Sequence, residues 1–321
     1  MNLKSRLRVS ALRAAYAHLE KAPEANVHRL LEAVQELVGR DKPAVQAFLT
    51  SMRSHFKNPE DNWYRCYCAL WRRVSPACMR RLFEVGVIEA GVLGAETRRE
   101  RAQTLDCVIP WGLRLAAGED VSAVALDAAV CQGLALGVGA FVLEAPQGVR
   151  RELLTLCFAH PQTLFFVFTP ASAVNEAAAA GIARVGNLIP VLGTAAAQDE
   201  AADRAAALLR ARGLLYADWC RCTIQTAGCL ADGTLPDACI ARGAAFLWLT
   251  DETGEGETPL DGTQRAALCG RLRAFRAGKP LPILGMWDAG SSLGALLGAR
   301  CPRVVPGTGR VEDVLRRRAA D

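Results

Sequence analysis

Cysteine is the residue type in this sequence that most directly suggests a functional site, because thiolates bind zinc and iron-sulfur clusters. The 321-residue chain contains 12 cysteines. They are Cys66, Cys68, Cys78, Cys107, Cys131, Cys157, Cys220, Cys222, Cys229, Cys239, Cys269 and Cys301. The first residues are polar and lack the apolar core of a secretion signal, so we expect a cytoplasmic protein with reduced thiols. Each isolated cysteine is then expected to pack as a small buried hydrophobe.

Two groups of cysteines are close enough in sequence to be weighed as metal ligands. The first could supply the four thiolates of a structural zinc site: Cys220, Cys222, Cys229 and Cys239. It lacks paired C-x2-C spacing and its last member falls in a helical segment, so core packing is favoured. The second group supplies three thiols in a helical stretch: Cys66, Cys68 and Cys78. Residues two apart on a helix face different directions, so packing is favoured there as well.

Histidine adds no catalytic arrangement to these thiols. The sequence has four histidines, and neither a Cys-His pair nor a Ser-His-Asp set is evident. His160 follows Cys157 by three residues and is expected to cap a helix or to pack. The sequence therefore predicts neither a catalytic residue nor a metal ligand.

Composition narrows the class of protein. The chain is 51% hydrophobic and 22% charged, which is ordinary for a soluble globular protein, and it has no apolar run of about 20 residues, so no membrane partner is expected. The net charge is +5, with basic clusters such as Arg72-Arg73 and Arg316-Arg317-Arg318. These clusters alternate with apolar helical positions and acids, which is typical of solvated helix faces, and nucleic-acid binding is not expected.

The pattern of apolar residues divides the chain into three regions. Residues 1–104 show helical spacing throughout and form an N-terminal helical extension. Residues 105–285 alternate short β-rich runs with amphipathic helices, which predicts a parallel sheet with helices outside it, as in a (β/α) barrel. The expected strands cover 108–115, 140–143, 164–168, 187–192, 213–216, 244–249 and 281–284. Residues 286–321 form a C-terminal extension.

Two of these strands carry a family resemblance. The stretch from His160 through Phe165-Phe166-Val167-Phe168-Thr169 to Gly186-Asn187-Leu188-Ile189-Pro190-Val191 resembles a branch of the radical S-adenosylmethionine (radical SAM) enzymes. The resemblance covers roughly residues 105–315. It implies an α/β fold built on a partial (β/α)6 TIM-like barrel. In active members it also implies a four-iron cluster that cleaves SAM to a 5′-deoxyadenosyl radical.

The motifs that such chemistry needs are absent from this sequence. Active members carry C-x3-C-x2-C after the first strand, whereas here residues 116–120 lead directly into the next helix without a cysteine. The family's Gly-Gly-Glu-Pro is replaced by Glu144-Ala145-Pro146-Gln147. The C-terminal auxiliary-cluster region is reduced to the remnants 286–290 and 307–313, with Cys301 as its single cysteine. The resemblance leaves a vestigial cofactor pocket, expected to include Arg114, Glu144, Gln147, Thr169 and Thr194.

The resemblance therefore implies a pseudoenzyme of the radical SAM superfamily, without a four-iron cluster. We expect a scaffold, regulatory or substrate-presenting partner, either of a catalytically complete radical SAM relative or of another protein. The alternative is an enzyme that has reused the barrel mouth and binds SAM or a nucleotide without iron.

Overall fold

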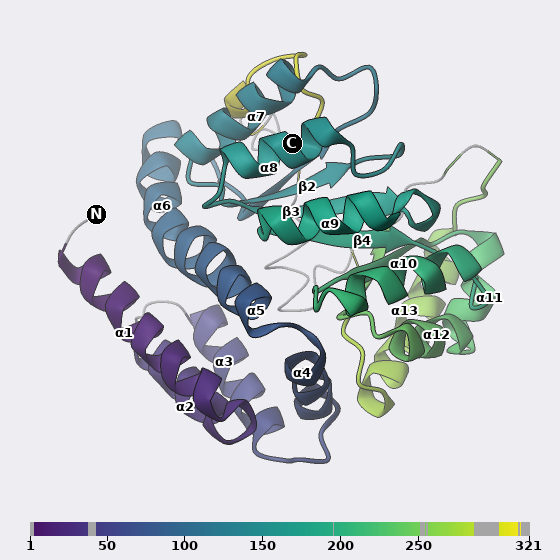
Figure 1. Cartoon of the computed structure of the whole chain (residues 1–321), viewed down its shortest axis with the longest axis horizontal. Helices are drawn as coiled ribbons and strands as arrows, with labels where there is room; N and C mark the ends of the chain where they lie inside the picture. Colours follow the sequence, from purple (N-terminus) through teal and green to yellow (C-terminus); the bar gives the residue numbers. More distant parts are fainter. Residues whose placement is uncertain are drawn as a thin grey trace.

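The computed structural model of the chain describes residues 3–37, 43–194, 196–250, 254, 256–285, 302–313 and 315. Helices surround one curled parallel sheet (Figure 1). Those before the sheet are α1 (Leu3–Lys21), α2 (Pro23–Leu37), α3 (Pro43–Phe56), α4 (Asn62–Arg73), α5 (Pro76–Leu82), the π-helix η1 (Phe83–Leu93) and α6 (Gly94–Leu105). Those that alternate with its strands are α7 (Ala123–Ala135), α8 (Arg151–Ala159), η2 (Ala171–Ala173), α9 (Glu176–Val185), α10 (Glu200–Ala211), α11 (Ile224–Ala231), α12 (Thr234–Arg242) and α13 (Gly262–Gly278).

The sheet contains eight strands in the order β7-β6-β5-β4-β3-β2-β1-β8. They are β1 (Gly112–Ala116), β2 (Ala140–Glu144), β3 (Leu164–Pro170), β4 (Leu188–Gly193), β5 (Ala217–Arg221), β6 (Leu247–Thr250), β7 (Ile283–Gly285) and β8 (Arg303–Val304). All neighbours pair in parallel. The α/β class and the partial barrel are thus confirmed, whereas the sheet has more strands than the six of the expected (β/α)6 barrel.

The extra strands lie at the two edges of the sheet. β7 adds to the β6 edge, and β8 comes from the C-terminal extension to pair with β1 through Arg114 and Arg303. The remnant 286–290 and Cys301 fall outside the described residues. Among the described residues of the C-terminal extension, those of β8 therefore lie beside β1.

Alternation along each strand separates two cores. Outward-facing residues such as Leu113, Phe141 and Leu249 pack under the surrounding helices. Inward-facing residues such as Phe166 and Trp248 fill the concave side of the sheet. Side chains of a strand alternate between the two faces of the sheet. An inward-facing residue at the carboxyl end of a strand therefore lies at the end of the barrel.

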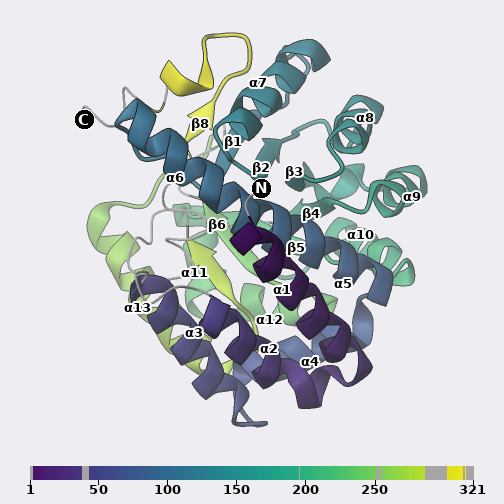
Figure 2. The same cartoon turned by 90° about the vertical axis from the view of Figure 1, so that its left-hand side faces the viewer.

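The N-terminal helices close the opposite end. The continuous α5–η1–α6 segment crosses the strands (Figure 2), and Val85 of η1 packs into the inner core with Ala140 and Leu164, the first residues of β2 and β3. A Cβ at Gly139 would lie 2.4 Å from the Cα of Ala90, so only glycine permits this approach. The carboxyl ends of the strands are left for a binding site.

One strand differs in place from the sequence prediction. The fifth strand was expected at 213–216, but β5 covers Ala217–Arg221. Gly213 ends the preceding helix with φ of 61°, and the strand itself holds Asp218 and Arg221, whose charges hide its apolar pattern. Asp218 is fully buried because Arg242 pairs with it.

No described helix carries a stretch both long and apolar enough to pass through a bilayer.

Candidate site at the barrel mouth

A cavity of about 690 Å³ lies at the carboxyl ends of the strands. Residues of β1 to β6 and of β8 line it, so it occupies the mouth of the partial barrel. Loops at this end of parallel sheets are where α/β barrels bind ligands. The volume falls in the range of cavities that hold a small organic molecule.

An ion-pair network covers the first-strand side of this cavity. Glu144, at the end of β2, accepts hydrogen bonds from Arg114 Nε at 2.9 Å and from Arg303 Nε at 2.8 Å. A second contact joins Glu144 to Arg114 Nη2. The two arginines face each other across the β1–β8 register, and each occupies a different oxygen of the carboxylate. Both oxygens of Glu144 are therefore engaged within the protein.

The opposite side of the cavity is aromatic. The ring of Trp219 on β5 stacks with Phe168 on β3 at a centroid distance of 5.4 Å, and the Arg221 guanidinium lies 5.2 Å from the Trp219 ring. A Cβ at Gly193 would lie 3.2 Å from Trp219 Nε1, so the glycine at the end of β4 makes room for the indole. This wall suits the apolar or planar part of a ligand.

Two buried polar atoms at this wall are without a partner. Thr250 and Trp219 both line the cavity, while the atoms Thr250 Oγ1 and Trp219 Nε1 are themselves buried and make no hydrogen bond among the described residues. Thr250 is 3% exposed, and it follows Trp248 by two residues on β6, so its side chain faces the concave side. Since at least about 90% of buried polar groups in proteins are hydrogen-bonded, these two atoms point to a polar ligand group.

Three of the five residues predicted for the pocket meet at this cavity. Arg114, Glu144 and Thr194 line it, and Thr194 also accepts a hydrogen bond from Arg242 at 3.5 Å. Gln147 is exposed and Thr169 is fully buried, and neither is among the described lining residues. Thr169 lies one position before the inward-facing Pro170, so strand alternation directs it to the outer core.

Sequence reasoning did not find four of the residues that shape the site: Trp219, Arg221, Thr250 and Arg303. The first two belong to the misplaced strand, and Arg303 reaches the mouth only through the pairing of β8 with β1. For Thr250 a signal existed, because a lone polar residue ends an otherwise apolar strand on the inward side.

The thiols do not suit a four-iron cluster at this mouth. None of the described lining residues is a cysteine. Cys107 precedes the amino end of β1, and Cys220 and Cys222 belong to the outer core rather than to the mouth. Burial raises the pKa of Cys220 to about 12, so its thiol is neutral at physiological pH. The residues at the rim of β1 therefore do not fit the cluster of active radical SAM enzymes.

The two cysteine groups that were weighed as metal sites are likewise dispersed. Cys220 and Cys239 are buried in the outer core, and Cys66 and Cys68 are buried on α4. Within the described part of the chain, neither group brings three donor atoms within 4.8 Å of one another.

The sequence matches no family model and no curated protein.

Proposed function

We propose that this protein is a non-catalytic, radical SAM-like barrel that binds a small organic ligand at its mouth. One observation carries the proposal: at the rim of β1, where the resemblance implies a cluster, Arg114 and Arg303 clamp Glu144. Neither guanidinium can coordinate iron, because it carries only N–H donors, and both oxygens of the carboxylate between them are already engaged. The side chains at this rim therefore suit polar contacts with a ligand better than coordination of a metal.

The proposed role is that of a regulatory or substrate-presenting partner. Its partner would be a catalytically complete radical SAM relative, because a barrel without its own cluster can join that chemistry only through a chain that has one. The described cysteines are free thiols, which supports the cytoplasm as the proposed compartment.

A second candidate function rests on Thr250 and Trp219. Their unpartnered donors suit a ligand that offers hydrogen-bond acceptors next to an apolar or planar surface. SAM and other nucleosides have this combination, so binding of SAM without cleavage is the ligand activity that we propose. The same ligand would also suit the alternative, an enzyme that has reused the barrel mouth for another reaction.

Thr250 provides the test of ligand binding. SAM at about 100 times its Kd is expected to raise the Tm of the iron-free protein by about 5 °C. Thr250→Val keeps the shape and removes a hydroxyl that has no protein partner, so the variant should be as stable as the parent without ligand. Its Kd for SAM should rise about fivefold through the lost hydrogen bond.

The control is Thr104→Val, which changes an exposed hydroxyl on α6. It should leave the Kd for SAM unchanged. A Thr250→Val protein that loses stability without ligand, yet keeps the full response to SAM, would show that the hydroxyl serves the fold and not a ligand.

A further inference from the structure

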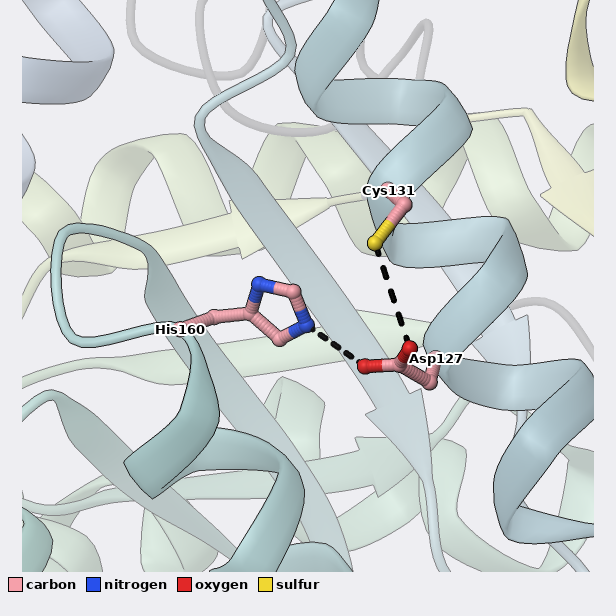
Figure 3. Close-up of side chains that lie close together, drawn as sticks. All are labelled: Asp127, Cys131 and His160. Atoms are coloured by element: carbon pink, nitrogen blue, oxygen red, sulfur yellow. Dashed lines mark hydrogen bonds and ion pairs between the residues drawn. The ribbon is translucent and has the colours of Figure 1, made fainter.

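A second cluster of chemically capable side chains lies away from the mouth, between α7 and the end of α8. Asp127 and Cys131 stand four residues apart on α7 and thus on one face of the helix, and His160 follows the last residue of α8. Figure 3 shows the three side chains turned toward one another. His160 Nε2 lies 2.7 Å from Asp127 Oδ1, and Cys131 Sγ lies 3.9 Å from Asp127 Oδ2.

The distances suit a metal ion. One donor atom from each residue lies within 4.8 Å of the other two, and no other such group of three occurs among the described residues. In a tetrahedral zinc site with bonds of about 2.0 to 2.3 Å, donor atoms are roughly 3.3 to 3.8 Å apart. For zinc to bind, the longer separations must shorten and the short His160–Asp127 contact must open by rotation of the side chains.

The backbone of His160 is held firmly while the donors remain accessible. Its N–H donates to Leu156 O at 3.1 Å, and its carbonyl accepts from Thr163 N at 3.1 Å and from Asn187 Nδ2 at 2.9 Å. The His160 side chain is 14% exposed, whereas that of Asp127 is 50% exposed and Cys131 is exposed. A histidine with a firmly held backbone beside two open donors gives a metal ion a partly prearranged site with a path from solvent.

We propose that Asp127, Cys131 and His160 bind a zinc ion, with the fourth position open to water or to a ligand from another molecule. Imidazole, thiolate and carboxylate are the three ligand types that zinc takes in proteins, whereas magnesium and calcium prefer oxygen alone. On binding, the Cys131 S–H bond breaks and its proton passes to solvent. The electron pair stays on sulfur and forms the Zn–S bond. The site differs from the sequence expectation, which assigned His160 to capping or packing.

Cobalt binding to the full chain tests this site. Co²⁺ should add to the parent in one equivalent and give a thiolate-to-cobalt charge-transfer band, and Zn²⁺ should displace it. Cys131→Ser should abolish the band. Cys131→Ser and Asp127→Asn should each weaken zinc binding at least about 10-fold in competition with a chromophoric chelator, since even outer partners of metal ligands are worth that much.

Cys229→Ser is the matched control, because Cys229 is also a partly accessible thiol on a helix but belongs to no such cluster. It should keep the band and the zinc affinity of the parent. Circular dichroism of all variants checks that they are folded. The proposal is overturned if folded Cys131→Ser or Asp127→Asn binds zinc within twofold of the parent, or if the parent takes up no equivalent of zinc.

Discussion

Replacing Arg242 with methionine is expected to lower the free energy of unfolding by about 3 to 5 kcal/mol, because it removes one partner of a buried ion pair. Arg242 is 4% exposed, and its Nε and Nη2 donate to Asp218 Oδ2 at 3.1 and 3.0 Å. Asp218 on β5 is fully buried. The substitution keeps most of the side-chain volume but leaves the carboxylate without its cation. Urea denaturation monitored by tryptophan fluorescence measures the loss.

The pH dependence of the stability of Arg242→Met shows whether the unpaired carboxylate of Asp218 causes the loss. Burial raises the pKa of Asp218, and Arg242 opposes this shift. Without the arginine the pKa rises further, so the folded variant binds a proton more tightly than the unfolded chain does. The Arg242→Met protein should therefore regain stability relative to the parent as the pH falls toward the pKa of Asp218.

Arg204→Met is the control for this experiment. Arg204 makes an exposed ion pair with Glu200 one helical turn away, which is worth at most about 0.5 kcal/mol. The assignment of a buried ion pair would be contradicted if Arg242→Met lost no more free energy of unfolding than Arg204→Met and its stability depended on pH as that of the parent does.

Asn187→Ala is expected to lower the free energy of unfolding by about 2 to 4 kcal/mol. Asn187 is fully buried, and its amide donates to the carbonyls of Cys157, His160 and Thr163 at 3.0, 2.9 and 2.9 Å. These carbonyls belong to the last turn of α8 and to the segment between α8 and β3, so the amide ties both to the start of β4. Removing the donor takes a hydrogen bond from the carbonyls of Cys157 and Thr163, each at a cost of about 1 kcal/mol or more, whereas the carbonyl of His160 keeps its bond from Thr163 N.

Thermal and urea unfolding of Asn187→Ala measure this effect, with Asn58→Ala as the control. Asn58 is exposed and accepts one local hydrogen bond from Glu60 N, so its loss should cost under about 0.5 kcal/mol. Equal stabilities of the two variants would show that the buried amide is dispensable.

The sequence predicted the sheet best where strands are purely apolar. The strands predicted at 164–168 and 187–192 were found at nearly their final bounds, because continuous apolar runs mark strands that are buried on both faces. The strand with Asp218 was misplaced, since a buried ion pair looks like a surface pattern until its partner Arg242 is known. β8 escaped notice because a two-residue strand has no period of its own.

The two candidate sites were predictable to different degrees. The resemblance implied Arg114, Glu144 and Thr194 for the pocket, and each of them lies within two residues of the carboxyl end of a strand. Arg303 could not, since its position depends on a pairing between distant parts of the chain. The zinc site has only an i, i+4 pair as its local signal, and its third member, His160, joins through packing of α7 against α8.

The most direct test of the central claim is the reaction of the reconstituted protein with SAM. The full chain is treated anaerobically with iron and sulfide, desalted, reduced with dithionite and mixed with SAM, and 5′-deoxyadenosine is measured by chromatography. The clamped Glu144 and the absence of cysteine among the described residues of the mouth predict no 5′-deoxyadenosine above a protein-free control. Formation of 5′-deoxyadenosine in proportion to bound iron would contradict a non-catalytic barrel.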